Sequence, residues 1–328
     1  MSGSTRDPAD STRDSEQVGE EIRSPLAIVG PTASGKTALS IEVAKRLPVE
    51  IISMDSRQVY RGMDIGTAKV SPAQRAAVPH YGLDLADPDE RFGAGRFARA
   101  AREWMVAIEE RKRMPLLVGG TGFFLRALTH PIFREPALDP ARRERLAGQL
   151  AAMDTEALRR WLERLDPPTA ARLQSWGGRQ RLIRALELPL LTGRPLSWWH
   201  RHAPPEAPPI TPRVFVLDMP RERLYSSINA RVEDMVRDGL VDEVRVLTEA
   251  GYAEGDPGMN ATGYIELLPF LRGEIALDAA LEQVRRNTRA YARRQLTWFR
   301  HQLPNGAVWL DATRPAGELA EEIVRISA

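Results

Sequence analysis

The chain has 328 residues, which is long enough for two domains or for one core with a large insertion. Its 43% hydrophobic and 27% charged residues are typical of a globular protein, and no run of 18 apolar residues predicts a membrane span. The absence of cysteine excludes disulfides, thiolate catalysis and cysteine-bound zinc, and the net charge of +2 does not by itself indicate a partner.

Residues 1–23 are rich in serine, aspartate, glutamate and arginine and contain no apolar segment. This composition predicts a disordered tail, because too little apolar surface is available to offset the entropy lost on folding. A secretory signal would need an apolar stretch, so we expect none here.

The first predicted elements are a short apolar strand at 26–29, a glycine-rich turn, and a helix at 38–47. The turn has the P-loop pattern G-x-x-x-x-G-K-[ST], formed by Gly30, Pro31, Thr32, Ala33, Ser34, Gly35, Lys36 and Thr37. Its glycines let several backbone N–H groups point at one anion, and the helix start adds the positive end of its dipole. A chance match in a turn is the alternative, and the flanking strand and helix argue against it.

Two side chains of this turn carry specific roles in P-loop chemistry. Lys36 would supply a charge for the terminal phosphate, and Thr37 a hydroxyl for Mg²⁺. The sequence therefore predicts a site for a diphosphate or triphosphate, with Mg²⁺ as cofactor and Thr37 as its protein ligand. Together with the absence of cysteine, the P-loop favours a cytoplasmic protein.

The rest of the fold is predicted from strands that recur at helix-length intervals. Four more apolar strands are predicted, at 49–54, 115–118, 214–217 and 307–310. One intervening stretch, from Phe97 to Ile108, has apolar residues on one face at 3.6-residue spacing. Short apolar strands alternating with helices predict an α/β fold like that of P-loop NTPases, with a mostly parallel sheet flanked by helices.

One segment, residues 135–208, shows helix signals and no strand. Three acidic residues precede apolar periodic stretches and look like helix N-caps: Asp139, Asp154 and Asp166. Another helix is predicted at 178–191, where Pro189 can introduce a kink. The proline-rich tract at 203–209 then returns the chain to the sheet as a stiff linker.

The predicted organisation is a tail at 1–23, an α/β core made of 24–134 and 209–328, and a helical insertion domain at 135–208. An insertion can move relative to its host, and a ligand can lie in the groove between them.

The ends of two predicted strands carry polar groups. The strand at 115–118 ends in Gly119, Gly120 and Thr121 and lacks the acid that many NTPases place there, whereas the strand at 49–54 is followed by Asp55. Ligands in open α/β sheets bind beyond the carboxyl ends of the strands, so Thr121 and Asp55 should both face the P-loop anion. Asp55 suits a base that deprotonates an acceptor, and a strand-end cap or turn residue is the alternative.

A cation on the core side of a helix is predicted at Arg231. Leu224, Ile228 and Met235 form an apolar stripe, and position 231 occupies its remaining slot. A buried cation needs an anion, which could be a phosphate or a structural carboxylate.

A possible RNA-binding helix lies near the C-terminus. Residues 285–300 contain six arginines and no acid. A stripe that includes Tyr291 and Gln295 could be buried, which would leave Arg285, Arg289 and Arg293 facing outward, one turn apart. Such a row suits a phosphate backbone, and an ordinary solvated helix face is the alternative.

Taken in order, several blocks resemble the tRNA dimethylallyltransferase (tRNA isopentenyltransferase) family over about residues 24–312. The blocks are the P-loop and residues 55–69, 117–121, 180–187 and 294–300. The resemblance implies transfer of a dimethylallyl group from dimethylallyl diphosphate to N6 of adenosine 37 in tRNAs that read codons starting with U, with release of diphosphate. The P-loop would then hold the leaving group rather than ATP.

The resemblance also implies site residues. Asp55, Thr121 and Arg231 would be catalytic, and the P-loop would bind the diphosphate. The anticodon stem-loop of the tRNA would contact Asp55, Ser56, Arg57, Gln58, Arg143, Gln180, Arg181, Leu182, Ile183, Arg184, Arg293, Arg294, Gln295, Thr297, Trp298 and Arg300. The target base would leave its stack and enter a channel above the P-loop, and the enzyme is expected to act as a monomer.

Two residues depart from the family pattern. Asn260 stands where an arginine is common, and Pro189 lies inside a helix of the insertion, so both alter the expected contacts with the RNA loop. Two other functions remain open on the sequence. One is a small-molecule or nucleotide kinase whose helical insertion acts as a lid, and the other is a non-catalytic RNA-binding protein with a vestigial P-loop.

Overall fold

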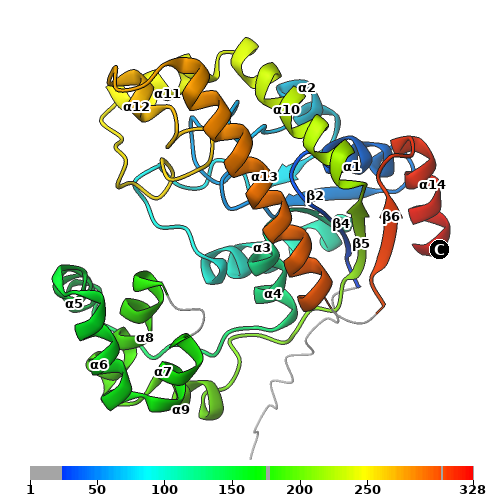
Figure 1. Cartoon of the computed structure of the whole chain (residues 1–328). Helices are drawn as coiled ribbons and strands as arrows, with labels where there is room; N and C mark the ends of the chain where they lie inside the picture. Colours follow the sequence, from blue (N-terminus) through cyan, green and yellow to red (C-terminus); the bar gives the residue numbers. More distant parts are fainter. Residues whose placement is uncertain (1–23, 175–177, 304–305, 328) are drawn as a thin grey trace, which may run out of the picture.

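The larger of two bodies in this computed structural model is built on a six-stranded sheet with the strand order β3-β2-β4-β1-β5-β6 (Figure 1). The structure describes residues 24–174, 178–303 and 306–327, so the tail predicted at 1–23 lies outside it. All neighbouring strands are parallel. The strands are β1 (Leu26–Val29), β2 (Val49–Ser53), β3 (His80–Tyr81), β4 (Met114–Gly119), β5 (Arg213–Asp218) and β6 (Val308–Asp311).

Each face of this sheet is covered because successive side chains of a strand point to opposite faces. Leu26 and Ile28 pack with α1 (Lys36–Ala44) and α14 (Ala316–Ser327) on one face. Ala27 and Val29 join the larger core on the other face, where α3 (Ala94–Glu110) and α4 (Gly122–Thr129) lie. The predicted P-loop-like α/β fold is confirmed, and only the two-residue strand β3 was missed.

Further helices close the site end of the core. The amphipathic α10 (Arg221–Arg237) packs against the long α13 (Leu277–Gln302), with Leu224, Ile228 and Ala292 buried between them. Figure 1 shows α13 running from the side of α11 and α12, past the sheet, to the side of α4. The remaining helices of the core are α2 (Pro72–Ala77), α11 (Leu240–Glu249) and α12 (Leu268–Leu271).

The smaller body is all-helical and has its own core, made of leucines such as Leu150, Leu158, Leu162 and Leu186. Its helices are α5 (Pro140–Ala152), α6 (Thr155–Leu165), α7 (Pro167–Gln174), α8 (Arg179–Thr192) and α9 (Leu196–His202). Two linkers join it to the α/β core, and they lie side by side, since Phe133 and Pro205 form an antiparallel bridge.

The predicted caps of these helices form as expected. Asp139 accepts hydrogen bonds from the N–H groups of the α5 first turn, and Asp154 accepts one from Ala157. Asp166 accepts one from Thr169 at the start of α7 and another from Ser197 near α9. Pro189 lies inside α8, which nevertheless continues to Thr192. Among the described residues, no helix has the length and apolar character that a membrane crossing requires.

Candidate active site

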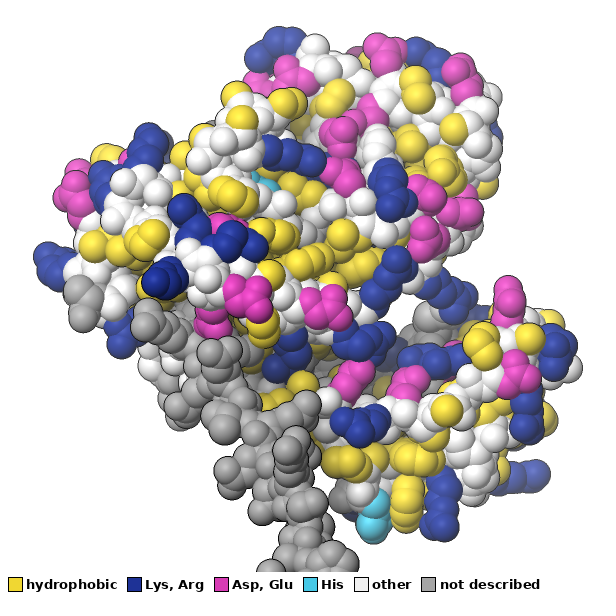
Figure 2. Space-filling view, turned by 180° about the vertical axis from the view of Figure 1, so that it is seen from behind, with side chains coloured by type: hydrophobic (Ala, Val, Ile, Leu, Met, Phe, Trp, Pro, Cys, Tyr) yellow, Lys and Arg dark blue, Asp and Glu magenta, His cyan; other side chains and the backbone are white. Residues whose placement is uncertain are grey.

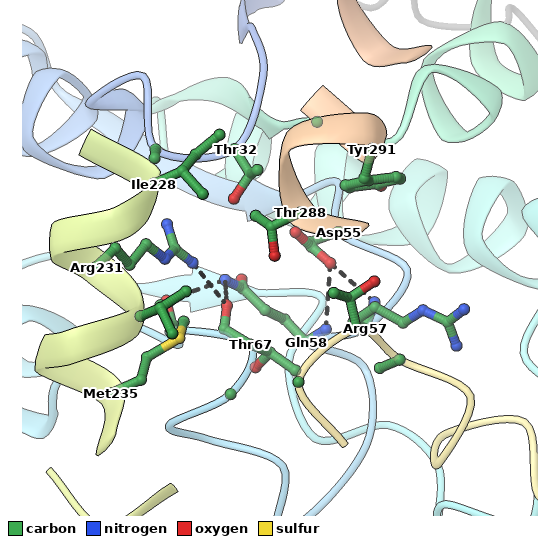
Figure 3. Close-up of a pocket in the computed structure, with 18 of the residues that line it drawn as sticks. Thr32, Asp55, Arg57, Gln58, Thr67, Ile228, Arg231, Met235, Thr288 and Tyr291 are labelled. Atoms are coloured by element: carbon green, nitrogen blue, oxygen red, sulfur yellow. Dashed lines mark hydrogen bonds between the residues drawn. The ribbon is translucent and has the colours of Figure 1, made fainter. Parts of the chain in front are cut away.

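A pocket of about 470 Å³ opens beyond the carboxyl ends of β1, β2 and β4. Its wall combines the P-loop, the turn after β2, and a loop around Thr67 with α10, α13 and residues 260–263. Figure 3 shows Arg231 extending from α10, and Thr288 and Tyr291 from α13, on either side of Asp55. The topology thus gathers segments that are distant in the sequence around one cavity, as is usual at the switch point of an open parallel sheet.

The P-loop has the backbone geometry of an anion cradle. Gly35 precedes α1 with φ 88°, and Ala33 has φ 62°, so the chain curls through the left-handed region twice. No side chain caps α1, which leaves the N–H groups of its first turn directed at the pocket end of the helix. The Ser34 hydroxyl is buried and has no hydrogen-bond partner among the described residues.

Two partly buried cations share this pocket. The ammonium of Lys36 donates to the Pro31 carbonyl at 2.6 Å, and the guanidinium of Arg231 donates to the Thr67 carbonyl at 3.5 Å. Burial, and then the charge of Arg231, lower the pKa of Lys36 to about 7; burial also lowers the pKa of Arg231. Within the described residues neither cation forms an ion pair with a carboxylate. The charge of Asp55, in the same pocket, acts to raise the pKa of both groups and so opposes the lowering by burial.

Asp55 provides the only carboxylate among the pocket-lining residues of the described chain. Its Oδ1 accepts hydrogen bonds from the backbone N–H groups of Arg57 at 2.8 Å and Gln58 at 3.4 Å. Asp55 is therefore a turn residue, and it also faces the pocket. One negative charge beside two partly buried cations leaves the cavity electropositive, which suits a ligand with several negative charges.

Thr121 contacts the turn that follows β2. Its hydroxyl accepts a hydrogen bond from the Ser56 N–H at 3.0 Å and lies 3.3 Å from the Ser56 hydroxyl, and it does not line the pocket. Its hydroxyl is therefore engaged with Ser56, and the expectation that Thr121 faces the anion stays a prediction. Because it joins the end of β4 to the turn that carries Asp55, its visible effect is to position that carboxylate.

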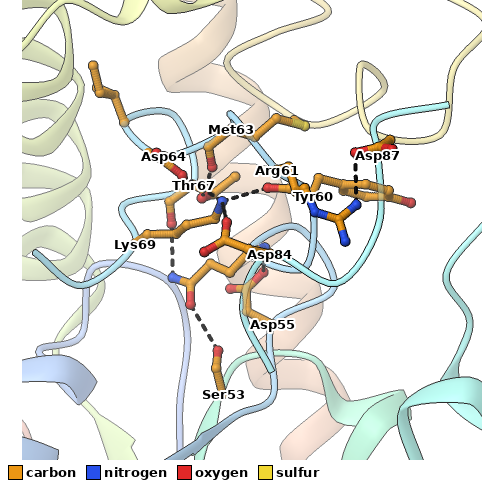
Figure 4. Close-up of polar contacts among 12 residues, drawn as sticks. Ser53, Asp55, Tyr60, Arg61, Met63, Asp64, Thr67, Lys69, Asp84 and Asp87 are labelled. Carbon is orange, nitrogen blue, oxygen red and sulfur yellow. Dashed lines mark hydrogen bonds and ion pairs between the residues drawn. The ribbon is translucent and has the colours of Figure 1, made fainter. Parts of the chain in front are cut away.

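Gln58 also turns toward the protein rather than toward a ligand. Its side chain accepts a hydrogen bond from Ser53 at 2.9 Å and donates to the carbonyls of Thr67 at 3.1 Å and Ala68 at 3.2 Å. Figure 4 shows how nearby Lys69 joins the Tyr60 carbonyl, Asp64 and Asp84. Both side chains fix the loop that forms the pocket wall.

Two further residues that hold this loop were missed by sequence reasoning. The carboxylate of Glu243, in the first turn of α11, accepts hydrogen bonds from the N–H groups of Asp64, Ile65 and Gly66 at 2.7 to 3.0 Å. The buried hydroxyl of Tyr264 donates to the same carboxylate at 2.5 Å. No local pattern reveals these contacts, since Glu243 lies 177 to 179 residues from its backbone partners.

Gln295, predicted to contact RNA, is instead 7% exposed and faces the P-loop. Its side-chain oxygen accepts a hydrogen bond from the Thr32 N–H, and its nitrogen donates to the Gly120 carbonyl, both at 2.9 Å. Its amide therefore connects α13 with two loops beside the pocket. A side-chain contact with RNA does not fit this arrangement, because both polar atoms are already engaged inside the protein.

Comparisons with known proteins identify the family. The family model described as IPP transferase matches residues 58–302, and the one described as isopentenyl transferase matches residues 24–78. A tRNA dimethylallyltransferase of Syntrophobacter fumaroxidans is 44% identical over 92% of this chain and 86% of the relative. Another, from Geobacillus kaustophilus, is 42% identical over 92% and 94%. The chain belongs to the tRNA dimethylallyltransferase family.

Solved structures agree with this assignment. The full-length tRNA isopentenylpyrophosphate transferase of Bacillus halodurans matches with a TM-score of 0.67 at 38% identity, over 93% of this chain and 95% of that one. A eukaryotic dimethylallyltransferase, seen in crystals acting on tRNA, matches with a TM-score of 0.80 at 25% identity, over 93% and 78%. The prediction of a transferase of this family is confirmed, in preference to a kinase or a non-catalytic RNA-binding protein.

In this member of the tRNA dimethylallyltransferase family, the arginines of α13 are not equally available. Arg293 is exposed and donates to the Tyr225 hydroxyl at 2.7 Å, and Arg300 pairs with Asp218 at 3.3 Å. Arg285 and Arg289 are half-buried and pair with Glu282, so the row of three outward arginines is only partly formed.

The remaining predicted positions on α13 differ in their surroundings. Arg294 lines the pocket, with its guanidinium 5.8 Å from the centre of the Tyr291 ring, and Thr297 is exposed. Trp298 is partly buried and packs against α4.

Burial and the nearby Asp55 carboxylate raise the pKa of Tyr291 to about 12, so its phenol keeps its proton at neutral pH.

The insertion contributes a second basic surface. Arg143 and Arg184 both pair with Glu135 and with the buried Glu187, an acidic anchor that the sequence did not reveal. Gln180 and Arg181 are exposed on the same helix as Arg184. Figure 2 shows Lys and Arg side chains gathered along the recess between the two bodies.

Two of the predicted RNA contacts in the insertion need correction. Leu182 and Ile183 are 2% and 5% exposed and fill the core of the insertion. Their side chains therefore support the helix that presents Gln180, Arg181 and Arg184 and do not themselves face a ligand.

Asn260, one of the two departures from the family pattern, lines the main pocket and donates to the Asp256 carbonyl at 3.0 Å.

The residues present fit a metal held mainly by its substrate. Among the described residues there is no group of three or more His, Cys, Asp or Glu side chains that could hold a metal ion. Thr37 lies next to Lys36 in the pocket and offers one hydroxyl. Mg²⁺ usually keeps several waters and binds through substrate phosphates with few protein ligands, which is compatible with this donor set.

Proposed function

We propose that this protein transfers the dimethylallyl group of dimethylallyl diphosphate to N6 of adenosine 37 in tRNAs that read codons starting with U. The observation that carries the proposal is the presence of Lys36 and Arg231, two partly buried cations without a salt bridge to a carboxylate among the described residues, beside Asp55 in one pocket. The names of the relatives, which are tRNA dimethylallyltransferases, point to the same substrates.

In the proposed reaction, the exocyclic amine attacks C1 of the prenyl group while the C1–O bond breaks, and the bonding electrons leave with diphosphate. Lys36, Arg231 and the N–H groups at the start of α1 stabilise the charge that develops on the leaving group. Asp55 accepts the proton that the amine loses when the new C–N bond forms. Bound Mg²⁺ would neutralise further charge on the phosphates, with Thr37 as its protein ligand.

The apolar part of the pocket suits the prenyl group. Ile228, Val232 and Met235 line the cavity from α10, and Val284 lines it from α13. The three side chains of α10 lie within two turns of Arg231 on that helix, so a molecule with a charged end and a short branched apolar end matches the wall. Such a surface also keeps water away from the allylic carbon, where it would compete with the amine.

The acceptor is the anticodon stem-loop of a tRNA, whose unpaired adenine would enter the pocket between the core and the insertion. Arg293, Arg294 and Thr297 on α13, with Arg181 and Arg184 on the insertion, would contact the surrounding nucleotides. We expect a monomer to suffice, acting in the cytoplasm where such tRNAs are used.

The test is a transfer assay with unmodified tRNA, labelled dimethylallyl diphosphate and Mg²⁺, without ATP. We expect prenylated adenosine 37 from the wild-type chain and a rate at least 100-fold lower from Asp55→Asn, because loss of a general base typically costs that much. Asp89→Asn, at an exposed acid with no hydrogen bond to another described residue, is the matched control. Phosphoryl transfer from ATP to a small acceptor, with no prenylation of tRNA, would instead establish the kinase.

A further inference from the structure

The side chain of Phe123 is unusually exposed for an aromatic residue. It is the second residue of α4 and 58% exposed, more than the two other exposed large aromatic side chains of the described residues, Trp161 at 43% and Trp309 at 42%. The next residue, Phe124, turns inward and stacks on Phe97 at 4.2 Å between ring centres. The ring of Phe124 therefore anchors α4 in the core, whereas the ring of Phe123 faces solvent.

The exposed ring has a rigid neighbour. Its centre lies 6.3 Å from the ring centre of Trp298 on α13, at an interplanar angle of 48°. Trp298 in turn covers Gly122, where any added Cβ would overlap the indole, and it meets Phe299 edge-on at 5.6 Å. Packing thus fixes the indole, and the indole supports one side of Phe123. We call Phe123 and Trp298 the aromatic platform.

The platform adjoins the pocket. Phe123 follows Thr121, whose hydroxyl holds the turn that carries Asp55. On the other helix, Trp298 lies one turn beyond Arg294, which lines the pocket. A loop of nucleic acid that sends a base into the pocket along α13 would therefore bring its neighbouring nucleotides to the platform.

Charge around the platform favours a polyanion. Arg126 lies one turn beyond Phe123 on α4, is exposed, and is oriented by a hydrogen bond of 2.5 Å to Gln302. On α13, Arg294 is exposed and lies one turn before Trp298. An exposed ring with an arginine on each of the two helices that form the platform suits an unpaired nucleotide, because the ring can stack on the base while the cations contact its phosphates.

We propose that Phe123, supported by Trp298, is the surface on which an unpaired base next to the target adenine stacks during the reaction. The proposal rests on the function proposed above, since it takes the anticodon loop as the occupant. Stacking uses the face of a base that every nucleotide has, so this contact would hold the loop open and add affinity without reading its sequence.

The experiment compares Phe123→Leu with Phe123→Trp. Leucine keeps an apolar side chain and a good helix former but removes the ring, whereas tryptophan restores a flat surface. We expect Phe123→Leu to raise the Kd for an anticodon stem-loop about tenfold with an unchanged KM for dimethylallyl diphosphate, and Phe123→Trp to bind like the wild type. Trp309→Leu, at an exposed ring on the edge strand β6, is the matched control.

A double-mutant cycle tests the stacking itself. The Kd values of the wild type and of Phe123→Leu are measured for the intact stem-loop and for two altered stem-loops. One of these lacks the base on the 5′ side of the target adenine, and the other lacks the base on its 3′ side. If Phe123 stacks on one of these bases, removing that base weakens binding to the wild type but has little further effect on Phe123→Leu. Additive losses with both stem-loops, or an unchanged Kd for Phe123→Leu, would overturn the proposal. Absence of prenyl transfer by the wild type would instead overturn the proposed function.

Discussion

Gln295 offers a direct test of how the diphosphate site is held in place. Gln295→Met keeps the length of the side chain but removes its amide, which leaves the Thr32 N–H and the Gly120 carbonyl without their partner. A buried polar group without a partner costs about 1–3 kcal/mol. Because both groups border the pocket, water can reach them in part, and we expect a total loss of about 2–3 kcal/mol.

For a core of this size, that loss corresponds to a Tm lower by about 4–10 °C, measured by calorimetry. The control is Gln283→Met on the same helix, an exposed glutamine without a hydrogen bond to another described residue, where we expect a change within about 0.5 kcal/mol. The KM for dimethylallyl diphosphate should rise about tenfold in Gln295→Met, because Thr32 belongs to the P-loop and loses its connection to α13.

Gln295→Glu separates this effect from general destabilisation. A glutamate still accepts from the Thr32 N–H, but it cannot donate to the Gly120 carbonyl and it adds a negative charge next to the diphosphate. Its KM for the diphosphate should therefore exceed that of Gln295→Met at low salt. If both variants unfold at the wild-type temperature and keep the wild-type KM, Gln295 does not hold the P-loop.

Three more predictions concern the site and its surroundings. Lys36→Ala should weaken diphosphate binding far more than tRNA binding, and equal losses in separate titrations would contradict this assignment of Lys36. Arg293→Ala should lower tRNA affinity and reduce the slope of log K against log salt by about 1, whereas an unchanged slope would remove this residue from the interface. Glu243→Gln should destabilise the protein by about 2–4 kcal/mol in denaturant unfolding, because an amide cannot accept from all three N–H groups and Tyr264; an unchanged midpoint would show that these bonds are dispensable.

The parts of the structure that the sequence predicted are those with local causes. The P-loop is recognisable because its glycines, lysine and threonine occur at fixed spacing between a strand and a helix. Asp139 and Asp154 could be named as caps because an N-cap acts on N–H groups two or three residues away. Arg231 could be placed inward because a helical period of 3.6 residues fixes which positions share a face.

The parts that were missed depend on which polar side chains turn inward. Gln58, Gln295 and Thr121 are polar residues near a binding site, and sequence alone does not distinguish a ligand contact from a bond to the protein's own backbone. That choice is made by segments distant in the chain, such as Gly120 for Gln295, which is 175 residues away. Glu243 has the same property, since a glutamate in the first turn of a helix is ordinary until the loop it holds is known.

The inward-facing glutamine changes the interpretation of α13. Gln295 and Trp298 are three residues apart and are therefore neighbours on one helix, where Gln295 contacts the P-loop and Trp298 supports Phe123. Displacement at an allylic carbon requires the amine and C1 to approach within about 3–3.5 Å in line with the bond that breaks. If the proposed function and the proposed stacking surface are correct, α13 contacts both the loop that would hold the leaving group and the surface that would hold the acceptor, so this one helix would position both substrates. A substitution that shifts α13 should therefore lower kcat more than it changes the binding of either substrate alone, since it disturbs their relative alignment.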